Sequence, residues 1–105
     1  MRIYIAGKIT GDKHYKRKFR KYEKKLIRLG HSVMSPAWLK ASPEFSWDDY
    51  MFVCRAMQET CEATLFLPDW MSSKGAKEEF LHADKLGQRK FYDIDEIPKR
   101  SKDDC

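Results

Sequence analysis

The chain has 105 residues and a mass of 12.5 kDa, with 42% hydrophobic and 35% charged residues and a net charge of +5. This length is typical of one compact domain, and the composition excludes a chain that is disordered over most of its length. No apolar run approaches the roughly 18 residues of a membrane span, and the amino terminus lacks a signal-peptide pattern, so we expect a cytoplasmic protein with no membrane partner.

Strand-like and helix-like segments alternate along the first ninety or so residues. A short apolar run at residues 2–6, broken by Gly7, predicts a buried strand. An amphipathic helix is expected over residues 14–29, because apolar residues recur there at steps of three and four, and Gly30 ends it. The later elements are expected in this order: a strand over 31–35, a loop over 37–46, a helix over about 47–61, a strand over 63–67, a helix after Ser72, Ser73 and Gly75 that ends at Gly87, and a strand over about 89–92.

This alternation predicts an α/β fold with a parallel sheet covered on both faces. The expected architecture is a small flavodoxin-like or Rossmann-like three-layer domain over residues 1–92, with a four- to five-stranded parallel sheet. Residues 93–105 are expected to form a polar, partly disordered tail. Ligands of such sheets bind beyond the carboxyl ends of the strands, so the loops at 7–14, 36–47 and 68–75 are where a site is expected.

The helix over residues 14–29 has a strongly basic polar face. Its cations are Lys16, Arg17, Lys18, Arg20, Lys21, Lys24, Lys25 and Arg28. Positive charge suits an anionic partner, which includes both nucleotides and nucleic acids. Because the apolar stripe of the helix is needed for the sheet, we interpret the basic face as solvated surface and rank nucleic acid last among the expected partners.

The loop after the first strand reads GKITGD, from Gly7 to Asp12. Glycines allow backbone amides to approach an anionic group, and Lys8 adds a positive charge. The segment matches neither the dinucleotide-binding nor the P-loop pattern, so a tight turn between strand and helix is the better explanation of these residues taken alone.

The loop before the last helix reads LPDWMSSKGAKEE, over residues 67–79. Ser72 and Ser73 are plausible N-caps, and a phosphate or a sugar hydroxyl placed there would meet free helix amides. Glu79 follows one to two turns into the helix, where its carboxylate can face the crevice. The alternative is that Ser73 only caps the helix and that Glu78 and Glu79 are solvated acids near its start.

Cysteines and aromatic residues carry weaker signals. The odd number of cysteines and the scattered histidines argue against a disulfide framework and against a metal site, and we expect no cofactor. Aromatic residues are concentrated in or beside the second loop: Trp38, Phe45, Trp47 and Tyr50. Such rings can stack on a base, but packing against a small core accounts for them equally well.

Three segments together resemble the nucleoside 2-deoxyribosyltransferase superfamily, which includes the 2′-deoxynucleoside 5′-phosphate N-hydrolases, and in particular a small bacterial and viral branch of it. They are IYIAGKITG at residues 3–11, GHSVMSPA at residues 30–37 and CEATLFLPDWMSSKGAKEEFLHADKLG at residues 61–87. They follow the same order as in the family and leave the tail uncovered.

The resemblance implies roles for individual residues. Glu79 matches the nucleophilic glutamate that attacks the anomeric carbon and releases the base, and Tyr4 matches the tyrosine that orients it. Gly7, Lys8 and Ile9 match the loop that lines the nucleotide site. Ser73, Gly75 and Ala76 match the stretch that contacts sugar or phosphate. The resemblance also implies a homodimer or higher homo-oligomer, in which a neighbouring subunit completes the site.

One position departs from the family's pattern. Cys54 stands where characterised members have an aspartate that assists the departing base, and a thiol is not an equivalent acid at neutral pH. Asp69, or Asp48 or Asp49 at the start of the second helix, could take its place, and each could equally be a cap or a solvated acid. We name Asp69 as the catalytic candidate, and Trp47 and Asp48 as substrate contacts.

The leading hypothesis is cleavage of an N-glycosidic bond, or base exchange, on a nucleoside or its 5′-monophosphate. A carboxylate nucleophile divides such a substitution into two easier steps, and it must be ionised to react; the helix start and the Tyr4 hydroxyl would both favour the anion. The alternatives are a nucleotide-binding module without catalysis and, ranked third, a basic nucleic-acid-binding protein.

Overall fold

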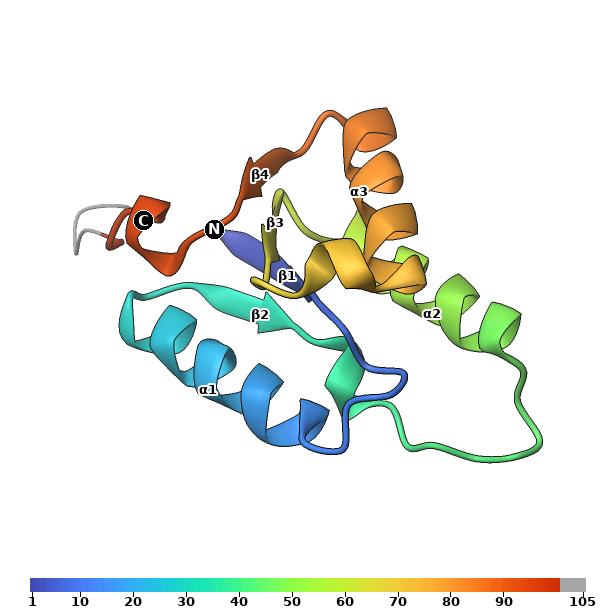
Figure 1. Ribbon diagram of the computed structural model, residues 1–105. Helices are drawn as coiled ribbons and strands as arrows, with labels where there is room; N and C mark the ends of the chain where they lie inside the picture. Colours follow the sequence, from blue (N-terminus) through green and yellow to red (C-terminus); the bar gives the residue numbers. More distant parts are fainter. Residues whose placement is uncertain (101–105) are drawn as a thin grey trace.

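A four-stranded parallel sheet forms the middle layer of the computed structural model, which describes residues 1–100 (Figure 1). The strands run in the order β2-β1-β3-β4. Their bounds are Arg2–Ala6 for β1, Ser32–Met34 for β2, Ala63–Phe66 for β3 and Arg89–Phe91 for β4. Ile3 of β1 is aligned with Val33 on one side and with Ala63 on the other. The predicted α/β fold with a four- to five-stranded parallel sheet is confirmed.

The central strands β1 and β3 are apolar because both of their faces are covered. Alternate side chains of a strand point to opposite faces, so Ile3 and Ile5 join one core cluster while Tyr4 and Ala6 join the other. All four residues of β3 are buried as well. This explains the near-continuous apolar runs in the sequence, which are typical of buried parallel strands.

Three helices cover the sheet. Helix α1, Tyr15–Arg28, packs on the Ile3 face, whereas α2, Trp47–Glu59, and α3, Lys74–Leu86, pack on the Tyr4 face. Figure 1 shows α1 on one side of the sheet and the α2–α3 pair on the other. Single turns of 3₁₀ helix follow β2, β3 and β4; they are η1 at Pro36–Trp38, η2 at Trp70–Ser72 and η3 at Ile94–Glu96. The three-layer arrangement is confirmed.

Capping residues set the helix boundaries close to their predicted positions. Ser46 and Asp49 form a reciprocal capping box at the start of α2, and the Ser73 hydroxyl accepts a hydrogen bond from the Ala76 amide at the start of α3. Gly87 ends α3 with a φ of +66°, a left-handed conformation that glycine adopts without strain. Helix α2 is two residues shorter than predicted, because the Cys61 amide turns back to the Gln58 carbonyl before β3.

Residues 93–100 pack against the domain, although the sequence assigns them to a polar tail. Ile97 is buried in the α1-side cluster, and the Arg100 amide donates a hydrogen bond of 2.7 Å to the Leu29 carbonyl. Ile97 is an isolated apolar residue in a polar stretch, which is why periodicity does not reveal it. The rest of the predicted tail, at 101–105, lies outside the described residues. Within residues 1–100, no helix has the length and apolar character needed to cross a bilayer.

The packing of α1 yields a matched test of the fold. Leu26 is fully buried against the sheet, whereas Ile27, its neighbour in the chain, is 55% exposed. Leu26→Ala is expected to lower the free energy of unfolding by about 2–5 kcal/mol, because it leaves a cavity in the core. Ile27→Ala should change it by less than about 0.5 kcal/mol. Urea denaturation followed by circular dichroism measures both, and equal effects would contradict this orientation of α1.

Candidate active site

A cavity of about 640 Å³ lies at the carboxyl edge of the sheet, where the fold predicts a ligand. All three predicted loops contribute to its wall. The lining residues are Gly7, Ile9 and Thr10 after β1, Pro36, Leu39 and Ala41 after β2, and Ser72, Ser73, Lys74, Gly75 and Ala76 after β3. The wall is mainly apolar. Among the residues within 1–100 that line it, Glu79 supplies the one carboxyl group and Lys74 the one cationic side chain.

Glu79 and Tyr4 form a buried pair in this cavity. Glu79 is only 4% exposed, Tyr4 is fully buried, and the Tyr4 hydroxyl donates a hydrogen bond to Oε2 of Glu79. Glu79 points inward because it shares a face of α3 with Ala76 and Ala83, which pack on the sheet. Its backbone carbonyl also accepts a hydrogen bond of 2.9 Å from the buried Gln58 side chain, which ties α3 to α2. The carboxyl group is therefore held in a fixed position.

Burial changes the protonation of this pair. Loss of solvent raises the pKa of Glu79 from 4.5 to about 8; the Tyr4 hydrogen bond and the Arg55 charge oppose this rise without cancelling it. Burial, together with the neighbouring carboxyl, also raises the pKa of Tyr4 well above its ordinary value. The expectation that Glu79 is ionised at neutral pH is thus wrong for the protein alone. Sequence reasoning counted the groups that stabilise the anion and omitted the cost of burying it.

Cys54 lies beside the pair and also lines the cavity. Burial and the negative charge of Glu79 raise the pKa of its thiol to about 11. At neutral pH the group is a neutral thiol, which makes it a poor acid and a poor nucleophile.

Asp69 and Lys8 lie outside the cavity wall and belong to an ion-pair network that joins two loops. The Lys18 ammonium donates to the Lys8 carbonyl at 2.8 Å, to Asp12 at 2.6 Å and to Asp69. Asp69 in turn accepts a hydrogen bond of 3.1 Å from the Lys8 amide. Hydrogen bonds from Lys18 and from the His14 amide lower the pKa of Asp12. Sequence reasoning missed Lys18, because one lysine in a basic helix carries no mark of an inward orientation.

Aromatic residues of α2 form one side of the cavity. Trp47 and Tyr50 line it, and the Lys74 ammonium lies 4.5 Å from the centre of the Trp47 ring. The Tyr50 hydroxyl accepts a hydrogen bond of 2.7 Å from the Ser42 amide and donates one to the Lys40 carbonyl. Asp48, a predicted substrate contact, is exposed and lies outside the wall.

The remaining aromatic and acidic candidates also lie outside the wall. Trp38 and Phe45 are exposed on the surface, and Asp49 serves the capping box of α2.

The predicted glycines allow close approaches of the backbone. A Cβ atom on Gly7 would lie 2.9 Å from Cδ1 of Leu67, and one on Gly75 would lie 3.2 Å from the sulfur of Met51. Ile9, Ser73 and Ala76 line the cavity as predicted. Five further members of the wall were not singled out from the sequence. Pro36, Leu39 and Ala41 lie within the predicted second loop, and Tyr15 and Met51 lie outside the predicted loops. Residues of these types look like core residues in any sequence pattern.

The fold and the site together define a small three-layer α/β protein with one buried carboxyl group in a cavity at the carboxyl edge of its sheet. The chain belongs to the family described as Domain of unknown function (DUF4406), whose model matches residues 1–92. No curated protein matches it in sequence.

Among solved structures, the chain is similar to the 2-deoxyribosyltransferase from the psychrotolerant bacterium Bacillus psychrosaccharolyticus. The TM-score is 0.68 at 18% sequence identity, and the match covers 97% of this chain and 93% of that one. This likeness concerns the fold. The resemblance to the nucleoside 2-deoxyribosyltransferase superfamily that the sequence motifs indicate is confirmed at that level.

The buried carboxyl predicts how stability depends on pH. Because the pKa of Glu79 rises from 4.5 to about 8 on folding, its contribution to stability is complete below about 4.5 and is lost as the pH rises through about 8. Glutamine at this position stays neutral and keeps that contribution. Thermal unfolding from about pH 5 to about pH 9 should therefore show Glu79→Gln gaining stability over the wild type as the pH rises. A constant difference across this range would contradict the buried neutral acid.

Proposed function

We propose that this protein cleaves the N-glycosidic bond of a nucleoside or a nucleoside 5′-monophosphate, with Glu79 as the nucleophile. The observation that carries the proposal is the Tyr4–Glu79 pair, which is buried in a cavity lined by all three loops at the carboxyl edge of the sheet. The fold shared with a 2-deoxyribosyltransferase supports it. The reaction is hydrolysis or transfer of the sugar to a second base.

In the proposed reaction, a carboxylate oxygen of Glu79 attacks the anomeric carbon, and the bond between that carbon and the base nitrogen breaks. The electron pair of this bond leaves with the base, which takes up a proton from solvent. Water or a second base then displaces Glu79 from the sugar and loses a proton to solvent, so two displacements retain the configuration at the anomeric carbon. Burial raises the pKa of Glu79 to about 8, and the hydrogen bond from the Tyr4 hydroxyl stabilises the ionised form that the reaction needs.

The cavity wall suggests how the substrate is oriented. The rings of Trp47 and Tyr50 offer faces on which a base can stack, which is worth about 1–3 kcal/mol per ring. The Lys74 ammonium and the first turn of α3 lie at the same wall and favour an anionic or hydroxyl-bearing group of the substrate. Asp69 acts in this proposal through the Lys18 network, by holding the β1–α1 loop against the β3–α3 loop. A dimer that completes the site remains part of the proposal.

A nucleotide-binding module without catalysis is the second candidate. The neutral Cys54 thiol next to Glu79, and the protonated state of Glu79 at neutral pH, favour it. Two measurements together separate the two functions. A binding module would bind a nucleotide at micromolar concentration by isothermal titration calorimetry, and it would release no base during long incubation.

The nucleophile is tested by replacing it. Glu79→Gln should reduce base release from a panel of nucleosides and 5′-monophosphates by at least about 10³-fold, because an amide cannot form the glycosyl ester. Chromatography of the free base measures the rate. Glu78→Gln is the matched control, since Glu78 is the neighbouring residue and pairs with Arg55 at 3.7 Å away from the cavity wall. Full activity of Glu79→Gln would refute the assignment.

The Tyr4 hydrogen bond predicts the pH profile. The value of kcat/KM should rise with pH and level off above about 8, because the free enzyme reacts through the ionised carboxyl. Tyr4→Phe removes a hydrogen bond that lowers the pKa of Glu79, so its profile should shift to higher pH.

Tyr15→Phe serves as the control for this profile. Tyr15 lines the same cavity, and its hydroxyl makes no hydrogen bond to Glu79 in the described part of the chain. An unshifted profile for Tyr4→Phe, with normal folding by circular dichroism, would contradict the role of Tyr4.

A further inference from the structure

The positive charge of this protein is concentrated at one helix. Residues 13–28 contain nine of the 21 Lys and Arg residues of the chain and only one of its 16 acidic residues, Glu23. The rest of the chain has more acidic than basic residues. The net charge of +5 is therefore a property of α1 and the two residues before it, whereas Lys74 is the one cationic side chain of the described residues that lines the cavity.

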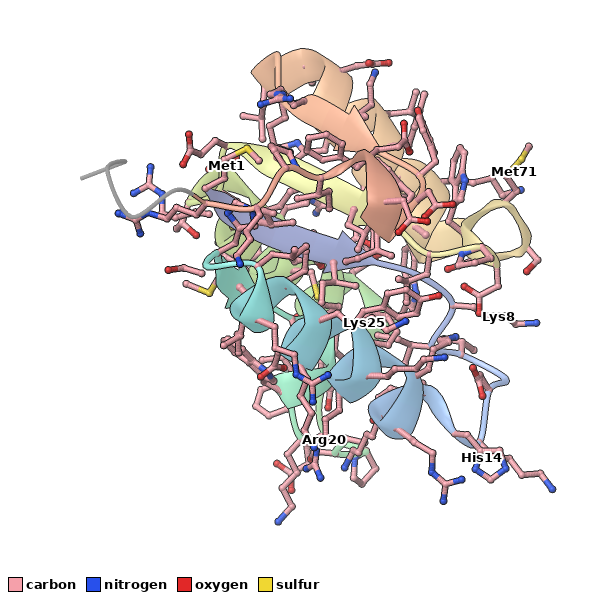
Figure 2. All side chains as sticks on the ribbon, turned by 90° about the vertical axis from the view of Figure 1, so that its left-hand side faces the viewer. Met1, Lys8, His14, Arg20, Lys25 and Met71 are labelled. Carbon is pink, nitrogen blue, oxygen red and sulfur yellow. The ribbon has the colours of Figure 1, made fainter. Side chains whose placement is uncertain are left out.

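Most of these cations project into solvent without an acidic partner. Within residues 1–100, Lys18 is the one α1 cation in an ion pair, and it turns inward to Asp12 and Asp69. Figure 2 shows long basic side chains, Arg20 among them, extending from α1 away from the sheet. The outer face of the helix is thus a surface of uncompensated charge.

Five of the exposed cations form a row along α1. They are Lys13, in the turn before the helix, and Arg17, Arg20, Lys24 and Arg28 on the helix, and we call them the α1 basic strip. The four helical members follow one another at steps of three or four residues, so they are about 4.5–6 Å apart along the axis and extend over about 16 Å. A regular row of cations of this length matches a regular row of anions such as successive phosphates.

An exposed indole lies beside the strip. Trp38 in η1 is 52% exposed, and its Nε1 donates a hydrogen bond of 2.8 Å to Oε1 of Glu23 on α1. The bond fixes the ring against the helix and engages the single acid of the segment. An aromatic face next to a cationic row is the arrangement with which proteins hold unpaired bases and their backbone together.

We propose that the α1 basic strip and Trp38 bind single-stranded nucleic acid, with the strip on the phosphates and the indole stacked on a base. The alternative of a lipid surface is disfavoured, because a membrane-bound amphipathic helix needs its apolar face for the acyl chains, and here Phe19 and Leu26 are buried against the sheet. The surface is separate from the cavity and does not depend on the proposed reaction.

Fluorescence anisotropy with labelled single-stranded DNA and RNA oligonucleotides of mixed sequence tests this proposal. Contacts to five phosphates predict a dissociation constant of about 1–100 µM at physiological salt and an affinity that falls about 100-fold between about 50 and 200 mM salt. A duplex of the same length should bind more weakly, because its bases are not free to stack. Equal binding of the duplex would contradict the preference for single strands. Absence of salt-dependent binding would contradict the proposal that this surface binds nucleic acid.

Matched charge reversals locate the binding surface. Arg17→Glu and Arg20→Glu combined should abolish measurable binding, whereas Lys77→Glu and Lys85→Glu combined change the net charge equally, on α3 at the opposite face of the sheet, and should leave most of it. An equal loss of affinity in both variants would show that the oligonucleotide responds only to net charge, and it would contradict the α1 basic strip as the binding surface.

Two further measurements complete the test. Trp38→Ala should weaken single-strand binding by about tenfold and duplex binding little. Vesicles of anionic phospholipid should not bind; vesicle binding without oligonucleotide binding would overturn the proposal. Circular dichroism checks that each variant is folded.

Discussion

The burial of one carboxyl group against one phenol governs the arrangement of the cavity. Tyr4 and Glu79 are 75 residues apart in the chain, and they meet because β1 lies at the centre of the sheet and α3 packs directly on it. Removing both groups from water favours their neutral forms. The packing that supports the fold therefore also favours the protonated form of Glu79, whose pKa burial raises to about 8.

The fold was accessible from the sequence because local signals and global topology agree. Gly30, Pro68 and Gly87 mark ends of elements, and the apolar runs of β1 and β3 are those of strands buried on both faces. The same logic located the three loops that form the cavity. Element ends were less accurate: α2 stops at Glu59, since a backbone turn at Thr60 and Cys61 leads into β3.

The site was only partly accessible, because side-chain partners depend on distances that a sequence does not contain. Motif resemblance brought Tyr4 and Glu79 together correctly, but it could not give the desolvation that keeps the acid protonated. Asp69 was a candidate substitute for the missing family aspartate because it is an acid that follows the third strand, yet Lys18 lies within bonding distance of it across 51 residues of chain. Ile97 is a core residue that the sequence did not reveal, because the segment around it is otherwise polar.

The Tyr50 hydroxyl attaches the loop between η1 and α2 to the helix that follows it. Tyr50 binds the backbone at both Lys40 and Ser42, while its ring forms part of the cavity wall. One side chain therefore holds the rim of the cavity and forms part of its wall, so replacing Tyr50 would alter both at once.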